Sequence, residues 1–332
     1  MNVLITSASR KVSLVKSFKR ALQAEGGGSV IAADANPQSA ALYFSDEAVI
    51  LPMDDDPAYA ATLLDFCATR KISLVVPTRD EELPFFAARK KEFAEAGAIV
   101  AVCGPEAVLK CRDKALFAEF CMSRGFNIPK IVDPAALPEF PLFVRPRRGK
   151  GGRGAVRVDF QEHLHALLKR MPDAIVQEFD RGGEYTVDLF ADFSGRVISA
   201  VPRRRVVVTG GESFVSRTVK DPELMDESAR LSTALGLVGH NTIQCFRDSG
   251  GVRFIEVNPR YGGGAALSIA AGADTPLWLI KLAGGETLAP RIGDFTDAMM
   301  MLRYTQDVFV EEAAPPLESK FDGGLTPQGS FI

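Results

Sequence analysis

The stretch Phe254-Ile255-Glu256-Val257-Asn258-Pro259-Arg260-Tyr261-Gly262-Gly263-Gly264 begins as an apolar strand and ends as a glycine-rich bend. Alternate side chains of a strand share one face, so Glu256, Asn258 and Arg260 are predicted to point together. Carboxylate and amide oxygens suit a hard cation such as Mg²⁺, and a neighbouring guanidinium suits a phosphate. The stretch therefore indicates a site for a metal-bound nucleotide triphosphate. The alternative is a strand edge with a salt bridge and a turn.

The composition is that of an ordinary globular protein. A length of 332 residues suggests two or three domains, and 46% hydrophobic with 24% charged residues indicates a soluble chain. A net charge of -3 and a pI near 5.8 give no sign of a general nucleic-acid surface. The five cysteines are scattered and include no Cys-x-x-Cys pair, which favours reduced thiols over disulfides or a zinc site.

The first residues, 1–6, are predicted to form a strand and lack the layout of a signal peptide. No apolar run approaches the roughly 18 residues that a membrane span needs. We therefore expect a cytoplasmic protein with neither membrane nor nucleic acid as a partner.

Residues 1 to 108 alternate between strands and helices. Strands are predicted at 3–6, 29–33, 48–51, 74–77 and 99–102, with an amphipathic helix after the first of them. This order predicts a parallel sheet with right-handed crossovers, whose ligands lie beyond the carboxyl ends of the strands. Three polar loops, 6–11, 34–37 and 78–82, occupy such ends, although helix capping and turn formation also explain their composition. No Gly-x-Gly-x-x-Gly follows the first strand, so a dinucleotide site is weakly supported.

Residues 109 to 180 change character. A helix carrying Lys114 precedes a strand at 142–144, which ends in Arg145. A loop rich in glycine and arginine, 147–154, then leads into a second strand at 155–158, which predicts a hairpin. Glycine N–H groups can cradle phosphate and the cations can neutralise it. The alternative is a flexible surface tip. The loop is not a Walker A motif, because no Gly-Lys-Ser/Thr and no helix follow.

The remaining chain favours long strands joined by hairpins. We expect strands at 174–179, 184–190, 196–201, 204–208, 242–246 and 254–258, with a helix at 222–235. This pattern predicts an antiparallel sheet carrying helices. Two short helices are predicted after the glycine bend, and the chain from residue 311 onwards is predicted to be a tail.

Taken together, these features resemble the ATP-grasp superfamily, and in particular one synthetase unit of the carbamoyl-phosphate synthetase large chain and its small stand-alone ligase relatives. The most specific segments are Val144-Arg145-Pro146 with the following Gly151-Gly152-Arg153-Gly154, and residues 254–260. The resemblance implies a mixed α/β and α+β fold. It divides the chain into an N-terminal parallel-sheet (pre-ATP-grasp) domain at 1–108, a small lid subdomain at 109–180, a C-terminal antiparallel-sheet subdomain at 181–310 and a tail at 311–332.

The resemblance also implies roles for individual residues. Lys114 and Arg145 would hold the nucleotide phosphates beneath a lid formed by 149–154, in which Gly149, Gly151 and Gly152 are the binding glycines. Gln177, Glu178 and Phe179 would form the hinge strand that meets adenine, and Glu184 would bind the ribose hydroxyls. Gln244, Glu256 and Asn258 would hold two cations, Mg²⁺ with Mn²⁺ as the alternative, and Arg260 would face the transferred phosphoryl group together with Arg145.

Two positions depart from the commonest pattern of the superfamily. Gln244 stands where many relatives carry an acid, which removes a charge and lowers the expected metal affinity. Arg145 stands where many branches carry lysine, and a guanidinium can bind phosphate through two hydrogen bonds.

The substrate end is less defined. Arg203 and Arg205 share a strand face and, with Glu212 and Ser213, are candidates for binding the acid, although an edge strand with protective charge explains them too. Gly262 and Gly263 could enclose the acceptor or simply permit a tight bend. The acidic loop 80–82 could recognise an amine or could decorate a helix N-terminus. The histidines have no obvious carboxylate partner, which favours structural or surface roles for them.

The implied activity is an ATP-dependent carboxylate–amine or carboxylate–thiol ligase that forms C–N bonds through an acyl phosphate and releases ADP and phosphate. Its partners would be a small-molecule acid and amine, and a homodimer is allowed because relatives often form dimers. The alternatives are a carboxyphosphate or carbamoyl-phosphate type synthetase that uses bicarbonate, and a non-catalytic nucleotide-binding regulatory protein.

Overall fold

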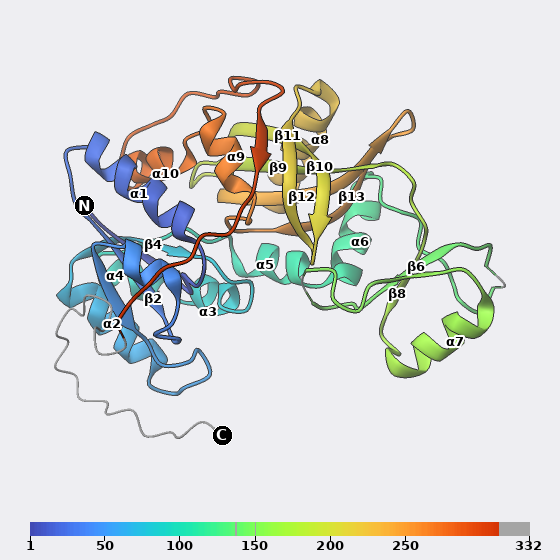
Figure 1. Ribbon diagram of the computed structural model, residues 1–332, viewed down its shortest axis with the longest axis horizontal. Coiled ribbons are helices and arrows are strands. Elements are labelled where there is room, and N and C mark those ends of the chain that lie inside the picture. The colour runs from blue at the N-terminus through green and yellow to red at the C-terminus, as the bar shows by residue number, and fades with distance from the viewer. Residues whose placement is uncertain (137, 150, 312–332) are drawn as a thin grey trace.

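The computed structural model describes residues 1–136, 138–149 and 151–311, and within them it contains three β-sheets. In Figure 1 the N-terminal sheet lies at one end of the long axis, the largest sheet in the middle and the smallest sheet at the other end. This confirms the predicted fold class. The predicted tail lies outside the described residues apart from Glu311, and the predicted domain boundaries stay predictions.

The N-terminal sheet is parallel, as predicted, with strand order β3-β2-β1-β4-β5. Apolar strands form it because helices cover both faces and bury nearly every side chain of β1. Its strands are β1 (Asn2–Thr6), β2 (Ser29–Asp34), β3 (Glu47–Ile50), β4 (Ile72–Pro77) and β5 (Ile99–Val100).

Helices and one 3-10 helix connect these strands. The predicted apolar stripe of the first helix, Leu14, Val15, Phe18 and Leu22, is buried. The connecting elements are α1 (Val12–Ala24), η1 (Ala40–Phe44), α2 (Tyr59–Thr69), α3 (Leu83–Ala88) and α4 (Lys90–Glu95).

The lysine-bearing helix consists of two helices, α5 (Pro105–Arg112) and α6 (Lys114–Ser123), which meet at Asp113. Asp113 has extended backbone, and its carboxylate accepts hydrogen bonds from the N–H groups of Ala115 and Leu116. An aspartate in this position caps a new helix N-terminus, which explains the break. It also places Lys114 on the first turn of α6.

The small sheet has its own apolar core. Its strands β6 (Leu142–Arg145), β7 (Val156–Val158) and β8 (Ile175–Glu178) pair antiparallel in the order β7-β6-β8, which confirms the predicted hairpin. Helix α7 (Gln161–Arg170), which the sequence pattern did not single out, follows β7. Leu142, Val144, Val158, Leu164 and Val176 form a cluster separate from the main core, so this lid packs as a unit of its own.

The largest sheet has the order β13-β12-β9-β10-β11-β14 and is antiparallel throughout, as predicted. The two strands expected at 196–201 and 204–208 are one strand, which corrects that prediction. Pro202 lacks an N–H group but does not end the strand, since it stays in register opposite Val187 of β9, and its carbonyl accepts a hydrogen bond from the N–H group of Val219. The strands are β9 (Gly183–Ala191), β10 (Val197–Thr209), β11 (Glu212–Thr218), β12 (Gly239–Asp248), β13 (Gly251–Asn258) and β14 (Met300–Leu302).

Three helices accompany this sheet: α8 (Pro222–Leu235), α9 (Ala265–Ala270) and α10 (Thr275–Ala283). The main apolar core continues from the N-terminal sheet into this sheet, so the two parts share one core. After β14 the chain runs without helix or strand back toward the N-terminal sheet (Figure 1).

Candidate active site

A cavity of about 2080 Å³ is lined by residues from all three sheets. Every residue that the sequence predicted for the site contributes to its wall, and so do parts of the three polar loops at the strand ends of the N-terminal sheet. The predicted residues are Lys114, Arg145, Gly149, Gly151, Gly152, Gln177, Glu178, Phe179, Glu184, Arg203, Arg205, Glu212, Ser213, Gln244, Glu256, Asn258, Arg260, Gly262 and Gly263.

Strand β13 carries a β-bulge at Ile255, which has no partner on β12. A bulge shifts the alternation of side chains by one residue. Phe254 and Val257 are therefore both buried in the core, while Glu256 and Asn258 both line the cavity. The local geometry thus confirms that these two polar side chains share a face.

Arg145 lies behind this bulge and is 5% exposed. Its Nη2 donates to the carbonyl of Ile255 at 3.2 Å, and its Nε has no hydrogen-bond partner within the described residues. Burial lowers the pKa of this guanidinium, with Glu256 acting in the opposite direction. A buried charged donor without a partner is costly, so this group is suited to an anion that enters the cavity.

Lys114 is the second predicted phosphate cation. Its Nζ donates to the carbonyl of Gly149 at 2.9 Å and lies 3.9 Å from Oε2 of Glu256. Burial lowers the pKa of the ammonium, with Glu256 acting in the opposite direction. The lysine therefore connects the lid loop to the carboxylate of β13.

Arg205 makes four hydrogen bonds within the site. It donates from Nη1 to Glu184 Oε1 at 2.5 Å and to Gln244 Oε1 at 2.9 Å. It also donates from Nε to Ser213 Oγ at 3.1 Å and from Nη2 to the carbonyl of Gly211 at 2.8 Å. Two groups predicted for different roles, the ribose acid and a metal ligand, are thus joined by one guanidinium.

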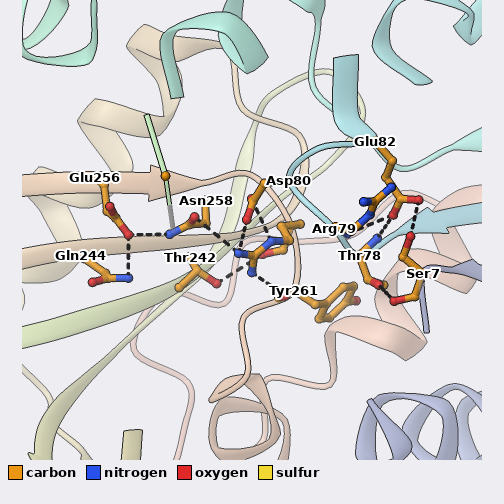
Figure 2. Close-up of polar contacts among 12 residues, drawn as sticks. Ser7, Thr78, Arg79, Asp80, Glu82, Thr242, Gln244, Glu256, Asn258 and Tyr261 are labelled. Carbon is orange, nitrogen blue, oxygen red and sulfur yellow. Dashed lines mark hydrogen bonds and ion pairs between the residues drawn. The ribbon is translucent and has the colours of Figure 1, made fainter. Parts of the chain in front are cut away.

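The three predicted metal ligands form a row (Figure 2). Glu256 Oε1 accepts hydrogen bonds from Gln244 Nε2 and Asn258 Nδ2, each at 3.1 Å. Glu256 is the single carboxylate of the row. Within the part of the chain that the structure describes, no group of three or more His, Cys, Asp or Glu residues could hold a metal ion.

Arg260 lies beyond the end of β13 and pairs with Asp80, which lies in the loop after β4 of the N-terminal sheet. Its Nε and Nη2 donate to the two carboxylate oxygens of Asp80 at 2.8 and 2.5 Å. Glu82 of the same loop is buried and accepts from the N–H groups of Thr78 and Arg79, and burial raises its pKa. The contacts of Glu82 support the interpretation that this acid lies at a helix N-terminus and does not bind an amine. The carboxylate of Asp80 is already paired with Arg260.

The lid is held at its base by Asp113, which receives Arg147 Nε at 2.8 Å and Arg148 Nε at 3.3 Å. Its tip touches the turn between β10 and β11. A Cβ atom on Gly211 would lie only 2.5 Å from the carbonyl oxygen of Gly151, and Gly211 has a φ of +78°. Both the close approach and the left-handed backbone require glycine at 211.

The predicted hinge residues line the cavity but already have partners. Gln177 is buried and donates to the carbonyl of Pro129 at 3.0 Å. Glu178 is exposed and pairs with Lys130 at 2.8 Å. The Phe179 ring lies under the guanidinium of Arg157, 4.8 Å from ring centroid to cation.

At the substrate end, Arg203 is 3% exposed and donates to Asp188 at 2.9 Å. Glu212 pairs with Arg303 at 2.7 Å. Arg204, which alternation places on the opposite face, is exposed. The alternation across these strand residues is thus as predicted, although each of the two cavity-facing arginines has an acidic partner.

The glycine bend is shaped by close packing. A Cβ atom on Gly262 would lie 2.6 Å from Thr242 Oγ1, and one on Gly264 would lie 2.5 Å from the guanidinium carbon of Arg203. Gly263 has more room, and its carbonyl accepts a hydrogen bond from Arg303. The glycine bend, which has no side chains, therefore packs directly against the buried guanidinium of Arg203.

Lys11 is a cavity residue that the sequence reasoning placed in a polar loop without singling it out. Its Nζ donates to the carbonyl of Ser7 at 3.2 Å, and no carboxylate lies within salt-bridge distance in the described residues. Burial, aided by the charge of Arg260, lowers its pKa to about 8. Its place at a strand end of a parallel sheet was the available signal.

His240 is buried and stacks on the ring of Tyr261, with the centroids 4.1 Å apart. Its Nε2 lies 3.8 Å from Asp188, so the expectation that it has no carboxylate neighbour is wrong. Burial lowers its pKa to about 4. The five cysteines are free and buried, as the prediction of unpaired thiols requires.

Within residues 1–136, 138–149 and 151–311, every helix is too short or too polar to cross a lipid bilayer.

Comparisons with known proteins agree with this architecture. Residues 3–101 match the family model described as PylC-like, N-terminal domain, and residues 170–306 match that of an ATP-grasp in the biosynthetic pathway with Ter operon. The carbamoyl phosphate synthase large chain of Deinococcus radiodurans is 26% identical over 196 residues, which is 51% of this chain. The match spans only 19% of that protein.

Solved structures show the same fold. The biotin carboxylase domain dimer of Hydrogenobacter thermophilus 2-oxoglutarate carboxylase, solved with MgADP, ADP and bicarbonate, has a TM-score of 0.70 at 18% identity and covers 90% of this chain and 73% of its own. The L-amino acid ligase of Bacillus licheniformis has a TM-score of 0.66 at 20% identity and covers 85% and 73%.

The chain therefore carries a PylC-like N-terminal domain followed by an ATP-grasp domain, and is homologous over half its length to the carbamoyl phosphate synthase large chain. The predicted resemblance to this superfamily is confirmed.

Proposed function

We propose that this protein is an ATP-dependent ligase that joins a small carboxylic acid to an amine, or to a thiol, through an acyl phosphate. The main support is the charge around Glu256. Lys114, Arg145 and Arg205 all act electrostatically on this carboxylate inside one cavity. Glu184, which pairs with Arg205, is a second acid, so two carboxylates face three cations and an excess of positive charge remains, which suits a metal-bound triphosphate.

The nucleotide would lie between the lid and β13, with its base near Phe179 and its phosphates near Arg145 and Lys114. The unpartnered Nε of Arg145 supports this placement, because an entering phosphate oxygen would satisfy it. For adenine to use the carboxylate of Glu178, it would have to compete with Lys130. Glu184 would reach the ribose while its other oxygen stays with Arg205.

Oxygen donors at Glu256 and Asn258 fit Mg²⁺, which when bound would neutralise charge on the β- and γ-phosphates. In the first step, a carboxylate oxygen of the acid attacks the γ-phosphorus, the bond to the bridging β-oxygen breaks and ADP leaves. In the second step, the amine attacks the acyl carbon, and phosphate departs with the electron pair of the broken C–O bond. The chain's work is positioning and charge stabilisation, and the lid excludes water from the acyl phosphate.

The acid would bind between the strand ends of the N-terminal sheet and Arg260. Lys11 donates to a carbonyl there and has no carboxylate within salt-bridge distance in the described residues, which leaves its charge available to a substrate carboxylate. Arg203 lies against Gly264 at the same end of the cavity. The acidic loop has less capacity for an amine than predicted, because Asp80 already binds Arg260.

The experiment is ATP turnover with a panel of acids and amines, measured as ADP and phosphate release. We expect release to require an acid, and the ligated product to require both substrates. Glu256→Ala should lower turnover by about 100-fold or more while the melting temperature changes little. Glu119→Ala, on the exposed side of α6, is the matched control and should leave turnover unchanged. Full turnover in Glu256→Ala would refute the assignment.

The second candidate is a carboxyphosphate or carbamoyl-phosphate type synthetase. It is favoured by the similarity to the carbamoyl phosphate synthase large chain and by the fold shared with a biotin carboxylase domain solved with bicarbonate. Phosphate release with bicarbonate as the sole acid would support it. Nucleotide binding without release in any mixture would instead favour the regulatory alternative. A homodimer, as in the Hydrogenobacter domain, remains a proposal that sedimentation would test.

A further inference from the structure

Arg205 lies at the metal row. Its side chain is only 6% exposed, and it makes four hydrogen bonds to groups on three strands and one turn. A guanidinium with donors fixed in this way cannot swing aside without leaving several partners unsatisfied. It is therefore a permanent positive charge within the site.

The amide of Gln244 is engaged at both ends. Its Oε1 accepts from Arg205 at 2.9 Å, and its Nε2 donates to Glu256 at 3.1 Å. The oxygen of Gln244 that would ligate a metal ion therefore already accepts a hydrogen bond from the guanidinium of Arg205. Glu184, the acid on the far side of Arg205, is neutralised by the same guanidinium.

Asn258 differs from Gln244. Its Nδ2 donates to Glu256 at 3.1 Å, but its Oδ1 has only a long 3.5 Å contact with Arg260. That contact exceeds the usual hydrogen-bond length, so this oxygen is open to a new partner. Together with Glu256 it forms the part of the row that still offers oxygen donors.

We propose that the guanidinium of Arg205 takes the place of one of the two metal ions expected in the site, so that the nucleotide binds with a single divalent cation held by Glu256 and Asn258. A second divalent ion at Gln244 would meet a fixed charge of the same sign with no carboxylate of its own. The row contains one carboxylate, which is enough for one Mg²⁺ that also binds phosphate oxygens and water. This inference rests on the proposed nucleotide site.

The test counts bound Mn²⁺ by electron paramagnetic resonance on the whole chain after equilibrium dialysis with a non-hydrolysable ATP analogue. We expect one Mn²⁺ per bound nucleotide in the unchanged protein. Two Mn²⁺ per nucleotide would overturn the inference and leave the proposed function standing. Failure to bind the nucleotide at all would overturn both.

Variants separate the role of Arg205 from that of its neighbours. Gln244→Glu should still bind one Mn²⁺, because the new carboxylate would pair with Arg205. The double variant Gln244→Glu with Arg205→Met should bind two, with a second ion where the guanidinium lay. One ion in the double variant, or two in Gln244→Glu alone, contradicts the proposal. Arg204→Met, on the exposed face of the same strand, is the matched control and should keep the count at one. Circular dichroism and nucleotide binding establish that each variant folds.

Discussion

Asp80 binds Arg260 through both carboxylate oxygens, at 2.8 and 2.5 Å, across 180 residues of chain. Asp80 follows the fourth strand of the N-terminal sheet, and Arg260 follows the last long strand of the ATP-grasp sheet. The arginine proposed to face the phosphoryl group is therefore neutralised by the N-terminal domain. A phosphate that uses Arg260 has to compete with this carboxylate or share the guanidinium with it.

Asp80→Asn should strengthen binding of the triphosphate analogue by about threefold to tenfold, because Arg260 would lose its competing anion. The same change should lower the free energy of unfolding by about 2 kcal/mol, since it breaks a largely buried pair. Titration calorimetry and thermal unfolding measure the two effects. Asp55→Asn, an exposed acid nearby, should change neither. Weaker nucleotide binding in Asp80→Asn would show that the pair orients Arg260 without competing for it.

Gly211→Ala should weaken nucleotide binding by about tenfold, because its Cβ would meet the backbone of Gly151 and keep the lid tip away from the turn. Left-handed backbone adds strain of about 1 kcal/mol. Gly210→Ala is the matched control, since it has a φ of +57° but nothing within 4 Å of the new Cβ. Tryptic cleavage at the lid arginines, with and without nucleotide, reports the contact. Equal behaviour of the two variants would contradict a role for the Gly211–Gly151 approach.

Lys11 should titrate near pH 8, well below the ordinary value of 10.5, because burial and Arg260 lower its pKa. Since the folded state holds this proton less tightly than the unfolded state, the stability penalty is present below pH 8 and is relieved toward pH 10.5. Loss of the positive charge above pH 8 should weaken anion binding at this end of the cavity.

Competitive acetylation across a pH series, read by mass spectrometry, measures the midpoint for Lys11. Lys169 on the exposed side of α7 is the control for access of the reagent to a solvated lysine. Inorganic phosphate should raise the midpoint of Lys11, because a bound anion favours the charged ammonium. A midpoint of Lys11 at the ordinary lysine value of 10.5 would contradict the prediction.

His240 should make the fold sensitive to acid. Its pKa is lowered from 6.5 to about 4 by burial, so above pH 6.5 the group is neutral in both states and has no effect. Between pH 6.5 and pH 4 only the unfolded state gains the proton, and stability should fall by about 3 kcal/mol. Denaturant unfolding of His240→Gln should lack this component, while the exposed control His165→Gln should keep it. A parallel acid response in both variants would sink the assignment.

Much of the fold follows from local sequence patterns. The buried stripe of α1 follows the helical period, the parallel strands β1 and β2 are short apolar runs, and helix α8 begins and ends at the predicted residues. The misses have local causes. The strands expected at 196–201 and 204–208 are continuous, since Pro202 stays in register opposite Val187 of β9. The break at Asp113 depends on a helix cap that also receives two lid arginines.

The residues of the candidate site were also predicted in part, and those that were missed depend on contacts between distant parts of the chain. All nineteen predicted residues line the cavity. Glu256, Asn258 and Arg260 were predicted from alternation along a strand, whereas most of the others were predicted from the resemblance to the ATP-grasp superfamily. Lys11 was not singled out, since its significance comes from burial and from the charge of Arg260 rather than from a motif. The carboxylate beside His240 was missed because Asp188 lies on another strand.

The sequence by itself determined the order of the elements and the polar face of β13, because side-chain alternation and turn chemistry depend on near neighbours in the chain. Only the tertiary structure decided which charge meets which. Arg203 and Arg205 are equivalent by alternation, yet one pairs with Asp188 and the other with Glu184 and Gln244. That difference arises from the register between β9, β10 and β12, and spacing along the chain does not specify how distant strands align.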